Sequence, residues 1–333
     1  MKLSILDQIP VPTNINATEA LARAVELAQL GDELGYERVW YAEHHNTKSL
    51  ASSAPEITAA FVAAKTARIR VGTGGVMMMH YSPLKIAESF KTLCGLAPGR
   101  IDFGAGRAPG GDMAAMVALA SGNRPLVNEQ YDKLETILRL IADKPTGDTV
   151  YDAVIPAPTK IVLPESYLLG STGQSAQVAG QLGIGYSFAQ FFQGQLSKQI
   201  VDIYKSNFRP TYFSQEPYMI VSYAVSVAET KEEAEYLSMP LQISRLQLMK
   251  GNIMPAMSPE EARDYPLTHY DKALLEKNRE LFLIGTPEEV LDMIQTDMQW
   301  YGFDEAMINC NLFSQESRLN SYRLLANRLN KTT

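Results

Sequence analysis

The chain has 333 residues, of which 46% are hydrophobic and 20% charged, and its 30 basic and 37 acidic residues give a net charge of -7. These values are ordinary for a globular protein of the size of one α/β barrel. A mildly acidic chain without a cluster of Lys or Arg residues argues against nucleic acid or an anionic membrane surface as the partner.

Two features of the sequence predict a cytoplasmic location. Cys94 and Cys310 are the only cysteines, which is too few for a disulfide framework. The N-terminal segment reaches Asp7 after few apolar residues, so we expect no signal peptide. No uninterrupted apolar run approaches the ~20 residues that a membrane-spanning helix needs. We therefore expect a protein of the reducing cytoplasm without a membrane partner.

Short runs rich in Val, Ile, Phe and Tyr alternate with longer segments that have helical spacing. The predicted strands cover residues 3–6, 38–42, 69–73, 101–104, 167–170, 185–190, 219–228 and 306–310. The predicted helices start at Asn16, Pro83 and Thr230 or lie over 57–65, 128–141, 175–182, 197–208 and 317–329. Serine, threonine or asparagine three residues before glutamate, and proline at a first helical position, indicate where several of these helices begin.

Eight strand–helix units in strict alternation imply parallel pairing, and eight parallel strands close a (β/α)8 TIM barrel. An open, doubly wound α/β sheet is the main alternative. Because the composition shows no break along residues 1–333, we expect one domain.

Two connections are too long for simple turns and form insertions at the rim. Residues 143–164 are rich in Pro, Asp and Thr and predict a small surface hairpin. Residues 250–285 precede a helix that begins at the segment Thr286-Pro287-Glu288-Glu289. This second insertion is expected to be either a lid over the rim or a surface excursion with short helices of its own.

A loop of small residues follows the fourth predicted strand, at residues 104–112. Its glycine spacing, G-x-G-x-x-x-G, and the interruption by Pro109 make it a weak dinucleotide fingerprint. Such a loop still lets a flat ring or a phosphate approach the backbone, and Arg107 offers a planar positive charge. The alternative is a tight turn with a solvated arginine.

A second such loop follows the fifth predicted strand and contains Ser171, Thr172 and Ser175. Backbone N–H groups at a helix start, with hydroxyls between them, form an anion site. The alternative is ordinary helix capping by serine or threonine. Because the two loops follow adjacent strands, a phosphorylated ligand explains them better together than either loop does alone.

The third predicted strand ends in Gly74 and Gly75, and a methionine run begins at Met77. Consecutive glycines allow unusual backbone, and methionine forms soft apolar surface for a ring or hydrocarbon. The alternative for these methionines is filling of the core. Three aromatic residues near the sixth strand either wall the same cavity or pack under helices, namely Phe188, Phe191 and Phe192.

His44 and His45 follow the second predicted strand. Neighbouring side chains on a strand point to opposite faces, so both histidines are not expected to bind one metal ion, and we predict no metal site. A structural pair bound to backbone carbonyls is the plain alternative. A role of the histidine pair in catalysis or cofactor contact is favoured only when the two candidate phosphate loops, after the fourth and fifth predicted strands, are considered together with the pair.

Taken in order, several segments resemble the bacterial luciferase-like family of flavin-dependent monooxygenases over nearly the whole chain. They are WYAEHH at 40–45, VGTGG at 71–75, SPLKIAE at 82–88, PGRIDFG at 98–104 and GTPEEV at 285–290. The resemblance implies a TIM barrel that uses reduced FMN, supplied by a separate reductase, and O2 to oxidise a small organic substrate.

The family's functional positions map onto residues of this chain. The resemblance implies that Ser171, Thr172, Ser175 and Arg107 contact the flavin phosphate. It further implies a cis peptide bond between Gly74 and Gly75 beneath the flavin, with Met77 in the apolar floor, and a catalytic role for His44. The insertion at 250–285 is a candidate cover for this site.

Gly106 stands where light-emitting members have a reactive cysteine, so an ordinary oxygenase is expected rather than light emission. A homodimer formed through the second and third helices, including residues 57–64, is also implied. Three other functions remain open: a deazaflavin-dependent oxidoreductase, a non-catalytic flavin-binding protein and a metal-dependent hydrolase.

Overall fold

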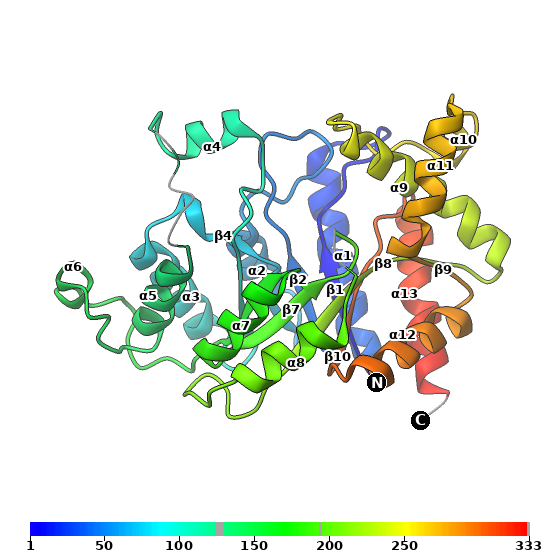
Figure 1. Ribbon diagram of the computed structural model, residues 1–333. Coiled ribbons are helices and arrows are strands. Elements are labelled where there is room, and N and C mark those ends of the chain that lie inside the picture. The colour runs from blue at the N-terminus through cyan, green and yellow to red at the C-terminus, as the bar shows by residue number, and fades with distance from the viewer. Residues whose placement is uncertain (124, 126–129, 193–194, 332–333) are drawn as a thin grey trace.

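The computed structural model describes residues 1–123, 125, 130–192 and 195–331. Eight parallel strands close into a barrel in the order β10-β1-β2-β3-β5-β6-β7-β8, and β8 pairs with β10 to complete the ring (Figure 1). Their bounds are β1 Lys2–Asp7, β2 Arg38–Tyr41, β3 Arg70–Thr73, β5 Ile101–Gly106, β6 Glu165–Gly170, β7 Gly185–Ala189, β8 Met219–Val227 and β10 Glu305–Asn309. The predicted TIM barrel is confirmed, and the open sheet is excluded because the first and last strands pair.

Two further strands lie outside the ring. The short strand β4 (Val76–Met77) pairs with the end of β5, and β9 (Phe282–Gly285) pairs with the end of β8. Neither was predicted from the sequence, because each is short and packs beside a longer strand.

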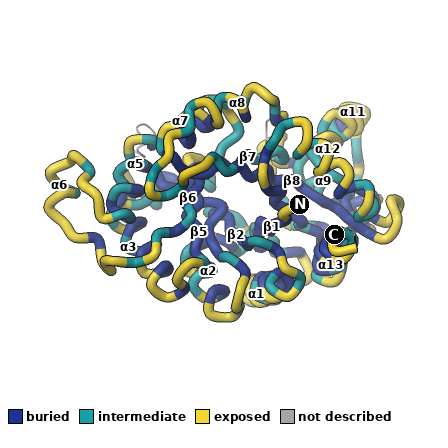
Figure 2. Tube along the Cα trace, turned by 90° about the horizontal axis from the view of Figure 1, so that it is seen from below, coloured by how far each residue is buried: buried dark blue, intermediate teal, exposed yellow. Residues whose placement is uncertain are grey.

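Helices surround the barrel, and the strands form a buried ring inside an exposed outer surface (Figure 2). The helices that follow the barrel strands are α1 Ala17–Leu34, α2 Pro55–Ala63, α3 Pro83–Leu96, α5 Gln130–Ile141, α7 Gly173–Leu182, α8 Lys198–Asn207, α9 Lys231–Met249 and α13 Gln315–Asn330. Further helical elements lie between them: α4 Met113–Leu119, α6 Thr149–Asp152, α10 Pro259–Arg263, α11 His269–Asn278, α12 Pro287–Tyr301, η1 Met78–His80 and η2 Arg279–Leu281. None of the helices within the described ranges has the length and apolarity needed to cross a membrane.

Side-chain caps and a proline in the first turn explain where the predicted helices begin. The Asn16 side chain accepts a hydrogen bond from the Glu19 backbone N–H at 3.0 Å, and the Thr230 side chain caps α9 in the same way. Pro83 occupies the first turn of α3, where its missing N–H costs nothing. The start predicted at residue 128 for α5 lies outside the described residues.

The hairpin predicted over residues 143–164 is wrong, because the structure has the helix α6 and irregular backbone there. Side chains satisfy the backbone groups that a hairpin would have paired. The Asp152 carboxylate accepts from the N–H groups of Thr146 and Gly147, and the Asp148 side chain caps α6. Aspartate used in this way favours a tight turn over a strand.

The insertion at 250–285 is a surface excursion with its own short elements, α10, α11, η2 and β9. It is tied to the loop after β1, because the Thr13 N–H donates to the Ala256 carbonyl at 3.2 Å. The buried Asp271 carboxylate forms an ion pair with Lys250 at 2.5 Å and joins α11 to the end of α9.

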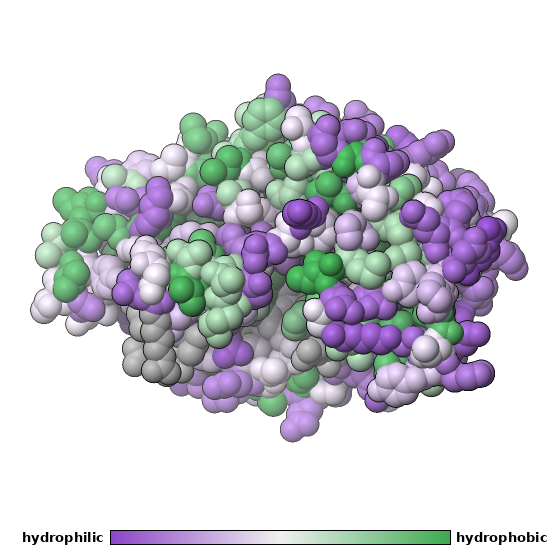
Figure 3. Space-filling model, turned by 90° about the horizontal axis from the view of Figure 1, so that it is seen from above, coloured by the Kyte–Doolittle hydropathy of each residue, from purple (hydrophilic) through white to green (hydrophobic). Residues whose placement is uncertain are grey.

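The carboxyl ends of the barrel strands lie at the top of Figure 1, with α4 on one side and α9, α10 and α11 on the other. Figure 3 looks onto this end, where apolar and polar side chains surround a hollowed centre. The loops that carry the predicted site residues all emerge here.

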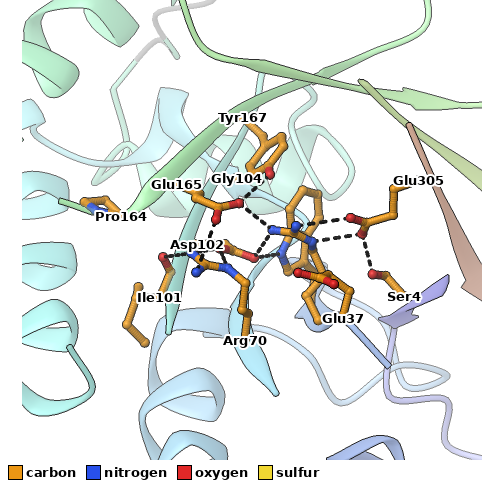
Figure 4. A network of polar contacts seen from close by, with 12 residues as sticks. Ser4, Glu37, Arg70, Ile101, Asp102, Gly104, Pro164, Glu165, Tyr167 and Glu305 are labelled. Carbon is orange, nitrogen blue, oxygen red and sulfur yellow. Dashed lines mark hydrogen bonds and ion pairs between the residues drawn. The ribbon is translucent and has the colours of Figure 1, made fainter. Parts of the chain in front are cut away.

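The opposite end of the barrel is filled by buried charges (Figure 4). The Arg38 guanidinium donates to Asp102 at 2.8 Å and to Glu305 at 2.9 Å. Arg70 donates to the other oxygen of Asp102 at 2.6 Å, and Glu165 accepts from Arg38 at 3.0 Å. Each of these residues stands at or near the start of its strand, so the network joins five strands and closes the base.

An apolar layer separates this base from the opposite end. It consists of inward-facing side chains of the barrel strands and of the residue after β2, namely Leu6, Trp40, Ala42, Tyr167, Ile220 and Met307. The larger apolar core lies between the outer faces of the strands and the helices. The open end is therefore the part of the barrel interior left for a ligand.

Candidate active site

His44 lies on the interior side of the barrel, just beyond the end of β2. Side chains alternate along a strand, and Trp40 and Ala42 both pack in the interior layer, so His44 continues that face. The His44 backbone N–H donates to the Ser52 carbonyl at 2.7 Å. Its Nδ1 atom is buried and has no hydrogen-bond partner within the described residues.

Burial lowers the pKa of His44 to about 4, and the neighbouring His45 acts in the same direction. The imidazole is therefore neutral at physiological pH. A neutral ring with one unpartnered nitrogen can either donate or accept one hydrogen bond, which suits contact with a ligand atom in the barrel.

His45 belongs to the opposite face and to a different set of contacts. Its Nε2 lies 2.7 Å from Oε1 of the fully buried Glu43. The same carboxylate accepts from the Tyr81 hydroxyl at 2.7 Å and from the Met77 backbone N–H at 2.8 Å. Glu43 thus ties the end of β2 to β4 and to the start of α3. Sequence reasoning missed this role, although the carboxylate immediately precedes the histidine pair.

The Gly74–Gly75 peptide bond is cis, as the resemblance implies. It lies between β3 and β4, and the Gly74 N–H donates to the Tyr41 carbonyl at 2.7 Å. A side chain on Gly75 would place its Cβ 2.7 Å from the Gly104 carbonyl oxygen, so this position admits only glycine without backbone movement. Gly74 is just as tightly packed, because its Cβ would lie 2.7 Å from the side chain of Leu6 and 3.1 Å from that of Trp40.

The methionine run divides between two environments. Met77 is in β4 beside the end of β5, where a Cβ on Gly106 would approach its sulfur at 3.2 Å. Met78 packs in the outer core between strands and helices. Met78 therefore fills the core, whereas a contact of Met77 with a ring stays a prediction.

The loop after β6 forms the N-terminus of α7. The Thr172 hydroxyl accepts from the Ser175 N–H at 3.3 Å, and the Ser175 hydroxyl accepts in return from the Thr172 N–H at 3.3 Å. The Ser175 hydroxyl also lies 3.0 Å from the Tyr186 hydroxyl. The side chains of Thr172 and Ser175 therefore cap the helix, while the first backbone N–H groups of α7 point along its axis towards the rim.

Arg107 lies in the loop after β5, the strand next to β6. Its side chain is exposed, and its guanidinium carbon lies 4.6 Å from the centre of the Tyr131 ring. Burial raises the pKa of Tyr186 to about 12, and the positive charge of Arg107 acts against this rise. Because β5 and β6 are neighbours in the barrel, the loop that carries Arg107 emerges beside the loop that leads into α7.

The three phenylalanines near β7 have different surroundings. Phe188 is fully buried in the outer core, so it packs under helices. Phe191 packs against the apolar layer of the barrel interior, and Phe192 is exposed. Only the last two lie where they could wall the open end.

The structure brings most of the predicted site residues to one end of the barrel. Along the described ranges, no group of three or more His, Cys, Asp or Glu side chains could hold a metal ion. A cavity of about 320 Å³ lies elsewhere, between β8, α9 and α13, and none of the predicted site residues lines it.

The residues at the open end fit a phosphorylated ligand with a flat ring. The N-terminus of α7 and Arg107 provide positive potential for a phosphate. Gly74 and Gly75 carry no side chain of their own beside β4, and the unpartnered Nδ1 of His44 is free to contact a polar atom.

Comparison with known proteins agrees with this arrangement. Residues 1–305 match the luciferase-like monooxygenase family. An uncharacterised protein of Bacillus subtilis, YceB, is 40% identical over 97% of this chain and 98% of its own length. The N-acetyl-S-alkylcysteine monooxygenase of the same organism is 34% identical over 98% of this chain and 97% of its own length.

Solved structures show the same likeness. The crystal structure of apo-MsnO8 has a TM-score of 0.89 and 33% sequence identity, and covers 99% of this chain and 97% of its own. The oxygenating component of a 3,6-diketocamphane monooxygenase, solved with FMN, shares the fold at a TM-score of 0.71 and 17% identity over 98% of both chains. The chain belongs to the luciferase-like monooxygenase family.

Proposed function

We propose that this protein is an FMN-dependent monooxygenase that uses reduced FMN from a separate flavin reductase and O2 to oxidise a small organic substrate. The observation that carries the proposal is the buried, unpartnered Nδ1 of His44 at the same end of the barrel as the helix terminus of α7 and Arg107. The family supports the reaction class, and the related structure solved with FMN supports the cofactor. We take residues 1–333 as one such domain in the cytoplasm.

The phosphate of FMN would be held by the loop after β6 and by Arg107. Because the hydroxyls of Thr172 and Ser175 are engaged in the cap, the backbone N–H groups near Ser171 and the first turn of α7 would supply the main contacts. The guanidinium of Arg107 would add a charge-assisted contact from the facing loop.

The isoalloxazine ring would lie over Gly74 and Gly75, at the carboxyl end of β3, with Met77 of β4 as apolar floor. When bound, the reduced flavin supplies the electrons that activate O2, and the protein supplies binding and orientation. Below the ring, the apolar layer that includes Trp40 keeps water from the reaction.

His44 would hold or move one proton beside the reacting atoms. Its low pKa keeps the ring neutral, so Nδ1 would donate or accept one hydrogen bond to the substrate or to oxygen as an uncharged group. Glu43 would act through position, because it fixes the backbone of Met77 and the ring of His45 on the other face of the strand.

Anaerobic titration of the purified protein with reduced FMN tests the cofactor, and O2 uptake with reductase and NADH tests the reaction. We expect tight binding of reduced FMN and substrate-stimulated O2 uptake in a screen of aldehydes, alkanesulfonates, amines and thioethers. Thioethers come first because one relative is an N-acetyl-S-alkylcysteine monooxygenase. Absence of flavin binding would refute the proposal, and O2 uptake no faster than with free flavin would leave only a flavin-binding protein.

The same titration, run in competition with a deazaflavin, decides between the two cofactors. A distant structural neighbour is a deazaflavin (F420)-dependent alcohol dehydrogenase with the same fold, at 16% identity. We expect FMN to bind more tightly. Preferential binding of the deazaflavin would replace oxygenation with hydride transfer.

The His44→Asn variant tests the catalytic assignment. We expect substrate oxidation to fall on the order of a hundredfold while reduced FMN still binds, because a positioned general acid or base contributes about that much. The matched control is His269→Asn, at an exposed position in α11, which should leave turnover unchanged. Unchanged turnover in His44→Asn would remove His44 from the reaction and leave the cofactor assignment intact.

A further inference from the structure

Arg245 is a half-buried cation in α9 without an anionic partner in the described part of the chain. Its Nη2 donates to the carbonyl oxygen of Phe192, and its guanidinium carbon lies 5.9 Å from the centre of the Phe192 ring. Its Nε is buried and makes no hydrogen bond there. Burial lowers the pKa of Arg245, since no nearby carboxylate offsets the cost.

Other buried or half-buried arginines among the described residues have partners for their guanidinium groups. Arg100 also lacks a carboxylate, but it donates to the Thr66 hydroxyl and to the carbonyls of Ile69 and Ala63. Arg38 and Arg70 share the carboxylates at the base of the barrel, and Arg318 pairs with Asp7 at 2.7 Å. Taking a guanidinium out of water is costly unless charges and hydrogen bonds replace the lost hydration. An anion that binds from outside the chain would replace the lost hydration of a half-buried arginine that still has an unused donor.

Arg245 lies at the open end of the barrel. Its contact Phe192 belongs to the loop after β7, and the preceding residue, Phe191, packs on the interior apolar layer. The C-terminal part of α9 lies at the same end of the molecule as α4, above the carboxyl ends of the strands (Figure 1). An anion held by Arg245 would thus sit at the entrance to the proposed flavin site.

The surroundings of Arg245 are apolar. Phe192 is exposed beside it, and three large apolar side chains of the same region are exposed as well, namely Leu248, Met249 and Ile253. Figure 3 shows apolar side chains gathered at this end of the molecule. A ligand that meets this surface would have a charged end and a hydrocarbon part.

We propose that the substrate is an amphipathic carboxylate and that Arg245 anchors its carboxylate at the barrel entrance, leaving the apolar part to reach the flavin. The inference rests on the proposed function for the reaction and adds the substrate class and its recognition residue. Arginine suits this task because its planar donors match a carboxylate. The edge made by Nε and Nη2 would take the ligand, since Nε has no partner and Nη2 has a second N–H besides the one given to the Phe192 carbonyl.

Isothermal titration of the full-length protein with octanoate and octanamide tests the anchor, since the two probes differ in charge and share one hydrocarbon tail. The variants are Arg245→Gln and Arg245→Lys, and the matched control is Arg263→Gln, an exposed arginine in α10. Each titration is run with and without FMN. Binding of octanoate and octanamide needs no turnover. A loss of probe binding can therefore be distinguished from a loss of flavin binding.

We expect wild-type protein to bind octanoate about tenfold more tightly than octanamide, in line with a charge-assisted hydrogen bond. Arg245→Gln should abolish this preference while keeping octanamide binding, Arg245→Lys should keep part of it, and Arg263→Gln should keep all of it. Equal affinity of wild-type protein for the two probes, or a carboxylate preference that persists in Arg245→Gln, would overturn the proposal. An equal loss of both probes would assign Arg245 only the structural task of holding the Phe192 carbonyl and would overturn it too.

Discussion

His44 and His45 are adjacent in sequence but lie in opposite environments. His45 is held by the buried carboxylate of Glu43, whereas the ring of His44 faces the barrel interior with a free nitrogen. The reason is the alternation of side chains at the end of β2. This contrast separates a residue that shapes the site from one that is available to a ligand.

The low pKa of His44 predicts a pH dependence of stability. The unfolded chain protonates this ring near its ordinary pKa of 6.5, whereas the folded protein does so only at about 4. Between these values the unfolded state binds more protons, so the free energy of unfolding falls as the pH falls from 6.5 to 4. The loss attributable to His44 is at most about 3 kcal/mol.

Urea unfolding at several pH values between about 4 and 7 measures this effect. His44→Asn should lose less stability on acidification than wild-type protein, because asparagine does not titrate. His269→Asn, at an exposed position, should follow the wild-type curve. Parallel curves for wild-type protein and His44→Asn would show that the ring is not held neutral.

At the scale of elements, the site depends on how closely two strands approach each other. The Thr73 hydroxyl donates to the Gly104 carbonyl at 2.8 Å and accepts from its N–H at 3.2 Å. This contact joins β3 to β5 directly beside the cis peptide of Gly74 and Gly75. One strand pair therefore positions both the proposed flavin floor and the start of the loop that carries Arg107.

Substitution of Gly104 tests that close approach. A Cβ there would lie 1.9 Å from the Thr73 carbonyl oxygen, which is backbone and cannot rotate away. We expect Gly104→Ala to destabilise the protein by about 1–3 kcal/mol and to weaken flavin binding. Chemical denaturation and the flavin titration measure the two effects.

Gly95→Ala is the matched control within α3. Its Cβ would meet only ordinary contacts, the nearest at 3.9 Å, and alanine favours a helix over glycine by about 0.5–1 kcal/mol. This variant should be as stable as wild-type protein or more so. If Gly104→Ala were as stable as Gly95→Ala, β3 and β5 would have room to move apart.

Element positions were predicted well where local signals specify them. Caps and N-terminal prolines marked α1, α3, α9 and α12, and the eight barrel strands were recognised from short apolar runs. The hairpin at 143–164 failed because turn-forming residues indicate a reversal without specifying what pairs across it. The strands β4 and β9 were missed because each depends on a neighbouring strand and not on its own pattern.

At the scale of the whole molecule, the outer surface of α2 is unusually apolar. Ile57 and Phe61 are one helical turn apart and are 68% and 56% exposed. The buried side of the same helix carries Ala59 and Val62, which pack on the barrel. We propose that the exposed side forms the contact of a homodimer, as the sequence resemblance implies.

Light scattering of an Ile57→Lys, Phe61→Lys double variant tests this contact. We expect wild-type protein to have the mass of a dimer and the variant to be a folded monomer, since two lysines cannot be buried without partners. Ile155→Lys is the control, because Ile155 is 77% exposed on the 143–164 segment, away from α2. A monomeric wild-type protein, or a dimeric double variant, would contradict the proposal.

The sequence by itself determined the barrel, the order of its strands and the ends at which the site residues emerge. Alternating apolar runs and helical segments are local patterns, and their number fixes how the ring closes. Alternation along one strand is also a local property, and it argued against one metal ion shared by His44 and His45, whereas the choice of His44 came from the family resemblance. The residues Gly74, Gly75, Met77, Arg107, Ser171, Thr172 and Ser175 were reached through motifs in chain order, and their contacts with flavin stay predictions.

Only the tertiary structure decided what these residues touch. The Thr172 and Ser175 hydroxyls cap α7 instead of remaining free, Glu43 joins His45 to Met77 and Tyr81, and Arg245 is left without a carboxylate among the described residues. Each of these contacts depends on how the chain packs around the residue concerned. Most of them join segments that are distant in sequence. Contacts of that kind leave no local pattern, because the partners are selected by the closure of the barrel and the packing of its loops.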